Sequence, residues 1–158
     1  MFRPLYRSRQ VLQALRPQID AGELDFAREM MSAAEADLFF AMERRDQRHA
    51  LEVAMRLRRG TDDRTLLVAA LLHDCGKGSV PVWLRILNVL SPAATDLLAA
   101  EGRGWRGAAH RLRHHAELGA LKARDAGCTE TAVRLIQGHV EPEEAWQHVL
   151  LRAADDAS

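Results

Sequence analysis

Residues 66–78 read LLVAALLHDCGKG, and this stretch decides the fold. Its first seven residues are apolar on every side of a helix, which is typical of a central helix surrounded by other helices. Gly76 and Gly78 break this helix, so the polar pair His73-Asp74 is predicted at its C-terminal end. Elsewhere apolar residues recur at helical spacing and strand-like alternation never persists. The predicted fold class is therefore all-α.

The flanking sequence predicts further helices with recognisable ends. Two capping boxes, Asp20–Glu23 and Ser32–Glu35, begin the first two helices. A helix over about 46–59 stops at Gly60, and Thr61-Asp62 caps the central helix. Further helices are expected near 82–90, from Pro92 onward, over about 105–125, from Thr129 onward and over about 146–154.

Length and composition exclude several classes of protein. The 158 residues include 22 Lys or Arg and 22 Asp or Glu, so the formal net charge is zero, which argues against bulk nucleic-acid binding. Hydrophobic residues make up 47% of the chain, enough for an ordinary core. Because no apolar run can span a bilayer and no secretory signal is present, we expect a soluble, cytoplasmic protein. The two isolated cysteines fit a reducing compartment.

The chain is expected to fold as one main domain, residues 21–158, preceded by a basic extension at 1–20. Before Asp20 the extension has no acidic residue, and its basic residues are Arg3, Arg7, Arg9 and Arg16. We interpret it as a peripheral helix packed on the domain. An anchor to a membrane or to a partner is the alternative.

Polar residues in core positions carry the functional signal. His49 shares a helical stripe with Val53 and Leu57 and so points inward, although a lone inward His is more often a hydrogen-bonded core residue than a ligand. Asp74 beside His73 at the end of the most apolar helix would be costly to bury without a cation. A metal ion would supply that cation.

Further candidate ligands lie downstream. His115 lies nearest the buried stripe of its predicted helix, whereas His114 points to the opposite side. His139 follows an apolar helical segment at the point where that helix ends. Asp155 and Asp156 both close the last helix, and helical phase does not separate them.

These residues, in this order, resemble the HD superfamily of metal-dependent phosphohydrolases, which are all-α domains named for a His-Asp pair. The resemblance covers about 42–155, and the phrase LLHDCGK at 71–77 is its specific part. It implies a compact helical bundle with a metal site between its central helices. It selects Asp155 over Asp156, and the ligands it implies for one metal are His49, His73, Asp74 and Asp155.

Members with two metals add two histidines, and His115 and His139 match those positions. The layout is similar to small bacterial members that cleave dinucleoside tetraphosphates. The cyclic-dinucleotide branch is not expected, because its Gly-Tyr-Pro signature is missing. The 5'-deoxynucleotidase branch usually has a Glu shortly after the pair, where this chain has Gly76-Lys77.

A shell of His nitrogens and Asp oxygens suits Fe or Mn, and Mg is also compatible. Such ions lower the pKa of bound water and polarise phosphoryl oxygens. Asp74 is the natural bridge between two ions, and Lys77 is the group expected to stabilise phosphate charge. Four arginines, which also fit a solvated helix face, offer a polyphosphate clamp: Arg103, Arg106, Arg111 and Arg113.

The predicted function is hydrolysis of a phosphate ester or anhydride of a nucleotide-like small molecule by metal-activated water, with Asp74 and Lys77 as catalytic residues. The alternative is a non-catalytic HD-like domain that binds a nucleotide or a partner protein as a regulator. The substrate, the identity and number of the metals, and the oligomeric state are left open.

Overall fold

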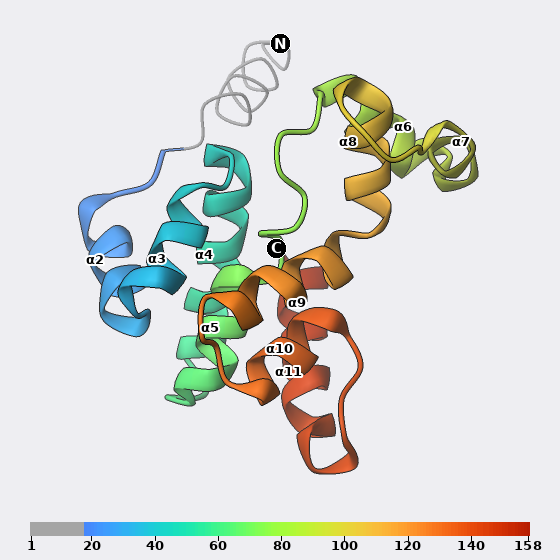
Figure 1. The fold of residues 1–158 in the computed structure, drawn as a ribbon. Helices are drawn as coiled ribbons and strands as arrows, with labels where there is room; N and C mark the ends of the chain where they lie inside the picture. Colours follow the sequence, from blue (N-terminus) through green and yellow to red (C-terminus); the bar gives the residue numbers. More distant parts are fainter. Residues whose placement is uncertain (1–17) are drawn as a thin grey trace, which may run out of the picture.

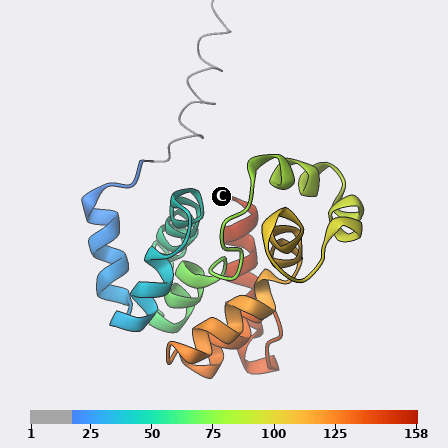
Figure 2. The same ribbon diagram turned by 45° about the horizontal axis from the view of Figure 1, so that its top comes forward.

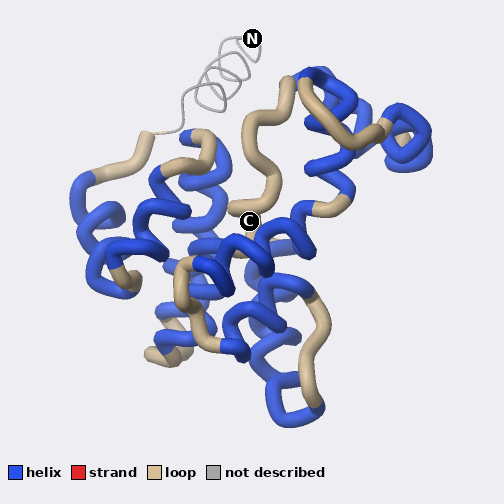
Figure 3. The backbone as a smooth tube through the Cα atoms, in the orientation of Figure 1, coloured by secondary structure: helices blue, strands red, loops and turns tan. Residues whose placement is uncertain are grey.

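The computed structural model describes residues 18–158, and this part of the chain is helical without a strand (Figure 1; Figure 3 shows the loops between the helices). The predicted extension at 1–20 lies outside it except for 18–20. No helix within 18–158 is both long and apolar enough to cross a membrane. The helices are α2 (Ala21–Met30), α3 (Ala33–Phe40), α4 (Arg44–Arg58), α5 (Arg64–Leu72), α6 (Val82–Leu90), α7 (Pro92–Leu98), α8 (Gly104–Arg113), α9 (His115–Asp125), α10 (Glu130–Gln137), the 3-10 turn η1 (Pro142–Glu144) and α11 (Ala145–Asp156).

Helix α5 is the centre of the fold, as its sequence predicts. Every residue from Leu66 to Leu72 is buried. Helices α4 and α10 make the most extensive contacts with it, and α2, α3 and α11 complete the shell around it (Figure 1). Because α5 is covered on all sides, the residues that follow it enter the interior of the protein.

Most predicted helix ends are confirmed. Asp20 and Ser32 each form a capping box with the Glu three residues later, Pro92 begins α7 and Thr129 caps α10. The predicted cap of α5 at Thr61-Asp62 is wrong. Asp63 takes that position, because its carboxylate accepts from the backbone N–H groups of residues 65 and 66. Helix α5 also ends at Leu72, before the glycines.

The single helix predicted over 105–125 is wrong. The chain breaks at His114 (φ −103°, ψ 22°), which separates α8 from α9. The two halves serve different cores: Leu112 of α8 packs in a small cluster, whereas Ala120 and Ala123 of α9 pack in the main core. One straight helix cannot reach both cores, and periodicity alone does not reveal this requirement.

Helices α6, α7 and α8 form a lobe beside the main bundle, which we call the α6–α8 lobe (residues 80–113; Figure 2). Its own small core consists of Val80, Leu84, Ala108, Ala109 and Leu112. A buried ion pair joins the lobe to α4. The guanidinium of Arg85 donates to both carboxylate oxygens of Asp46, at 2.8 Å each, and to Glu43 at 3.0 Å.

Glu144 of η1 binds side chains of α10, and its lowered pKa should make the stability of the protein depend on pH. It accepts hydrogen bonds from Arg134 and from Thr131, and these bonds, with Arg134 the larger cause, lower its pKa to about 2. A carboxylate with a lowered pKa contributes stability above its ordinary pKa, and that contribution is lost as the pH falls toward 2. We therefore expect Glu144→Gln to flatten the decline of unfolding free energy between about pH 4.5 and 2. Urea denaturation over this range measures it.

Exposed Glu143 provides the matched control. It has no ion-pair or side-chain hydrogen-bond partner among the described residues. The acid decline of Glu143→Gln should follow that of the wild-type protein. Equal acid sensitivity in the wild-type protein and Glu144→Gln would contradict this role for Glu144.

Candidate metal centre

Three helices bring four of the predicted ligands together. His49 comes from α4, His73 and Asp74 follow α5, and Asp155 lies near the end of α11. One ligand atom from each of His49, His73 and Asp74 lies within 4.8 Å of the others. Oδ1 of Asp155 lies 2.8 Å from Nε2 of His49 and 3.6 Å from Nε2 of His73. We call these four residues the ligand cluster.

The ring nitrogens of His73 show what the ligand cluster requires. Its Nδ1 lies 2.8 Å from the carbonyl oxygen of Ala70, and because a carbonyl only accepts, Nδ1–H must donate. The other nitrogen, Nε2, is buried without a hydrogen-bond partner and lies 3.6 Å from Oδ1 of both Asp74 and Asp155. A lone pair that faces two carboxylates is unfavourable, so this position needs a cation.

The neighbouring charges in the ligand cluster also shift the pKa values of His73 and Asp155. Burial lowers the pKa of His73, but the nearby carboxylates of Asp155 and Asp74 outweigh burial, so the pKa is raised. The hydrogen bond with His49, and then the nearby imidazole of His73, hold the pKa of Asp155 far below its ordinary value. A proton and a metal ion therefore compete for Nε2 of His73, and the carboxylates favour either one.

Asp74 is the most enclosed member of the ligand cluster, with a side chain only 2% exposed. Burial raises its pKa, but the charges of His73 and Lys77 outweigh this effect and the pKa is lowered. Its Oδ2 accepts from Nζ of Lys77 at 2.6 Å, while Oδ1 faces His73. The two oxygens of Asp74 therefore serve different partners.

His115 lies at the edge of the ligand cluster. As the first residue of α9, it donates from Nδ1 to the carbonyl of Leu112 at 2.8 Å, which leaves Nε2 free to accept. That nitrogen lies 3.9 Å from Oδ1 of Asp74. The break at His114 turns His115 toward Asp74, although the helical phase that suggested it assumed one continuous helix.

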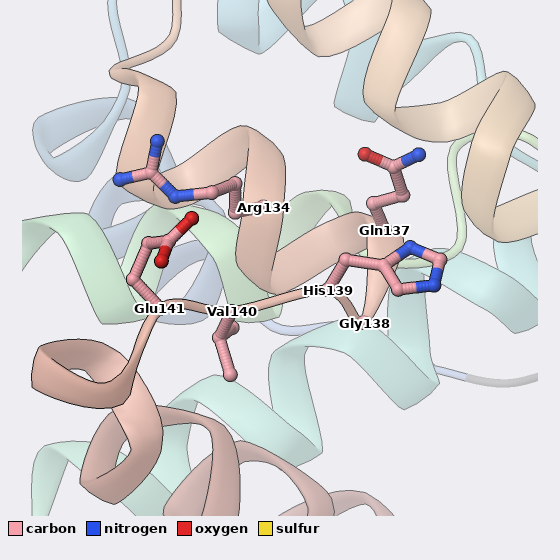
Figure 4. Close-up of a pocket in the computed structure, with 6 residues that line it drawn as sticks. All are labelled: Arg134, Gln137, Gly138, His139, Val140 and Glu141. Atoms are coloured by element: carbon pink, nitrogen blue, oxygen red, sulfur yellow. The ribbon is translucent and has the colours of Figure 1, made fainter.

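His139 is not brought to the ligand cluster. It is exposed in the loop after α10, and no hydrogen bond or ion pair within 18–158 joins it to the other candidates. Figure 4 shows its imidazole on the side of Gln137, opposite Arg134 and Glu141. These residues line a separate pocket of about 450 Å³. Gly138 ends α10 in the left-handed conformation (φ 79°), and the chain then leaves the helix.

Two basic residues, Lys122 and Arg111, hold the loop after α5, a role that the sequence did not suggest for either. Nζ of Lys122 donates to the carbonyl of Cys75 at 3.0 Å. Arg111 donates from Nε to the carbonyl of Lys77 and from an η nitrogen to that of Ser79, at 3.2 and 2.9 Å. Of the two lysines of this arginine-rich chain, Lys77 lies in this loop and Lys122 binds it, so their rarity was a usable signal.

Two of the four arginines predicted to clamp a polyphosphate have other partners in the structure. Arg111 holds the loop, and Arg113 forms an ion pair with Asp96.

The two adjacent acidic residues at the end of α11 differ in their surroundings: Asp155 is half-buried in the ligand cluster, whereas Asp156 is exposed. The structure thus makes the distinction that helical phase left open.

A comparison with known families finds a match to the part of the chain that holds the ligand cluster. The family model described as HD domain matches residues 47–157. The matched range begins before His49 and ends after Asp155, so it contains the whole ligand cluster. No curated protein and no solved structure shows a significant match to the chain.

Proposed function

This chain belongs to the HD-domain family, and on that basis we propose that it hydrolyses a phosphate ester or anhydride of a nucleotide-like small molecule with metal-activated water. The family consists largely of metal-dependent hydrolases. The observation that carries the proposal is the buried Nε2 of His73, without a partner and facing two carboxylates. An imidazole lone pair beside two carboxylates is a suitable set of ligands for a divalent cation.

The residues proposed to hold the metal are His49, His73, Asp74 and Asp155. A set of imidazole nitrogens and carboxylate oxygens suits Fe or Mn, and Mg when water supplies further oxygens. His115 and His139 are proposed for a second ion. His115 already faces Asp74, whereas His139 would have to move in from its exposed loop.

A bound divalent ion supplies a water whose pKa is lowered toward neutrality and polarises the phosphoryl oxygens. The protein's own groups orient the reaction. The bond from His73 to Ala70 fixes its tautomer, so Nε2 presents its lone pair. Lys77, held by Asp74 at 2.6 Å, keeps further N–H donors for a phosphate oxygen. Arg111 and Lys122 hold the loop that carries Lys77.

The direct test is a screen for turnover. Purified full-length protein is loaded with Mn, Fe, Co or Mg and supplied with nucleotides, dinucleoside polyphosphates and a generic phosphodiester. We expect metal-dependent hydrolysis of at least one phosphate substrate. Elemental analysis of the same protein tests the alternative: no bound metal after purification, and none after reconstitution, would favour the non-catalytic regulator.

Metal binding is expected to stabilise the folded protein, because the ligand cluster assembles only when the helices pack. At a metal concentration 100 times Kd, the unfolding free energy should rise by about 2.7 kcal/mol. Thermal unfolding with and without Mn measures this effect. It should weaken as the pH falls, because the raised pKa of His73 lets protons compete for Nε2.

Adjacent acidic residues give a matched pair for this measurement. Asp155→Asn should remove most of the stabilisation by Mn, whereas Asp156→Asn should keep it, since Asp156 is exposed. The same Mn-induced shift in both variants would show that the metal binds elsewhere.

A further inference from the structure

Helix α6 buries Leu84 in the core of the lobe but also exposes apolar side chains on its outward side. Its only charged residue, Arg85, points inward to the carboxylates of α4. Its outward face, here called the apolar face, consists of Val82, Trp83, Ile86, Val89 and Leu90, all exposed. Val89 and Leu90 are 80% and 77% exposed. A surface helix normally buries its apolar stripe against the core, so this face requires an apolar partner outside the described chain.

The neighbouring helices of the α6–α8 lobe also expose large apolar side chains. Leu97 of α7 is 83% exposed, and Trp105 at the start of α8 is also exposed. The rings of Trp83 and Trp105 lie 5.9 Å apart, so the two helices share one aromatic edge. The lobe lies at the periphery of the molecule, beside the main bundle rather than within it (Figure 1). The α6–α8 lobe therefore exposes several large apolar side chains at the periphery of the molecule.

Basic groups border this surface. The guanidinium of Arg106 lies 5.8 Å from the centre of the Trp105 ring, and exposed Arg103 directly precedes α8. Neither arginine has an acidic partner among residues 18–158, whereas Glu101 is the one acidic residue of the loop between α7 and α8. Tryptophan beside arginine, next to apolar side chains, is the arrangement that sits between lipid headgroups and acyl chains. The arginines complement anionic headgroups in charge.

We infer that the α6–α8 lobe docks on an anionic lipid surface. Val89, Leu90 and Leu97 enter the boundary between headgroups and acyl chains. Trp83 and Trp105 lie at headgroup level, where Arg103 and Arg106 contact phosphate groups. The association is peripheral, because α6 has only nine residues and no described helix can span a bilayer. It is independent of the proposed hydrolysis.

Sedimentation with vesicles tests the docking. Full-length protein is mixed with vesicles of phosphatidylcholine and phosphatidylglycerol, or of phosphatidylcholine alone. We expect binding to the anionic vesicles, weaker binding to the neutral ones, and loss of the difference at high salt. With Trp146→Phe as background, the emission of Trp83 and Trp105 should shift to shorter wavelength when anionic vesicles are added.

Two double variants test which residues of the lobe contact the vesicle. Val89→Gln combined with Leu90→Gln should lower vesicle partitioning at least about tenfold, because two largely exposed apolar side chains no longer enter the lipid. Arg103→Gln combined with Arg106→Gln should lower binding to anionic vesicles about 25-fold, or fivefold per arginine. Val149→Gln on α11 is the matched control, since Val149 is also exposed and apolar but lies outside the lobe. It should bind as the wild-type protein does.

Three results would overturn the inference. The first is absence of sedimentation with both kinds of vesicle. The second is vesicle binding that survives the Val89 and Leu90 replacements, which would place the contact elsewhere, such as in residues 1–20. The third is a concentration-dependent dimer that these replacements abolish, because the apolar face would then be covered by a second copy. Since the replaced side chains are exposed, unchanged melting temperatures should confirm that each variant folds.

Discussion

Asp74→Asn is expected to lower metal-dependent turnover at least about 1,000-fold, which corresponds to a loss of about 4 kcal/mol of transition-state stabilisation. Asp74 is buried, faces His73 with one oxygen and accepts from Lys77 with the other. An amide keeps the shape of the side chain but loses its negative charge. The replacement therefore weakens metal binding and also removes the ion pair that holds Lys77. Steady-state rates of both proteins at the same fixed metal concentration measure the effect.

Asp156→Asn serves as the control for this prediction, because Asp156 is exposed and outside the ligand cluster. Its turnover should stay within about twofold of the wild-type rate. The combined His73→Ala and Asp74→Ala variant is the strictest test. Metal-dependent hydrolysis that survives both replacements would contradict the proposed function, since neither the imidazole nor the carboxylate would then be needed.

Gly76→Ala is expected to lower the unfolding free energy by about 3 kcal/mol, the upper part of the usual range for overpacking. A Cβ on Gly76 would lie 2.0 Å from the carbonyl oxygen of His115 and 2.6 Å from the backbone nitrogen of Gly119. Both atoms belong to the backbone of α9, so no side-chain rotation relieves the contact. Helix α9 must move away, and His115 moves with it.

Gly60→Ala is the matched control, because its new Cβ would meet only the carbonyl oxygen of Leu57, at 3.8 Å. This replacement should be neutral or stabilise the protein by less than about 1 kcal/mol, since Ala restricts the unfolded chain. Urea denaturation compares the two variants. A loss for Gly76→Ala no larger than that for Gly60→Ala would contradict the close approach of α9 to the loop.

Local signals explain the successful parts of the sequence interpretation. Helix α5 is apolar on every side, and the capping boxes at Asp20 and Ser32 need only residues three positions apart. The His73-Asp74 pair follows α5 directly, so its burial followed from that of the helix. The cap of α5 was misplaced locally, at Thr61-Asp62 instead of Asp63. The larger error involves distant packing: the break at His114 depends on two separate cores, and periodicity reports only one helix at a time.

The candidate site divides in the same way. Residue type and order along the chain were enough to propose His49, His73, Asp74, His115, His139 and Asp155, with help from the family resemblance. Their distances were not available from order. Helical phase did not distinguish Asp155 from Asp156, and it gave no reason to expect His139 in a separate pocket.

The sequence alone determines most helix positions, the central role of α5 and the identity of the polar residues that follow it, because periodicity and capping act over a few neighbouring residues. Only the tertiary structure decides that His49 meets Asp155, 106 positions away, and that the apolar side of α6 faces outward. The reason is that such contacts depend on how whole helices pack, and each helix can present its side chains only after its neighbours have fixed its orientation.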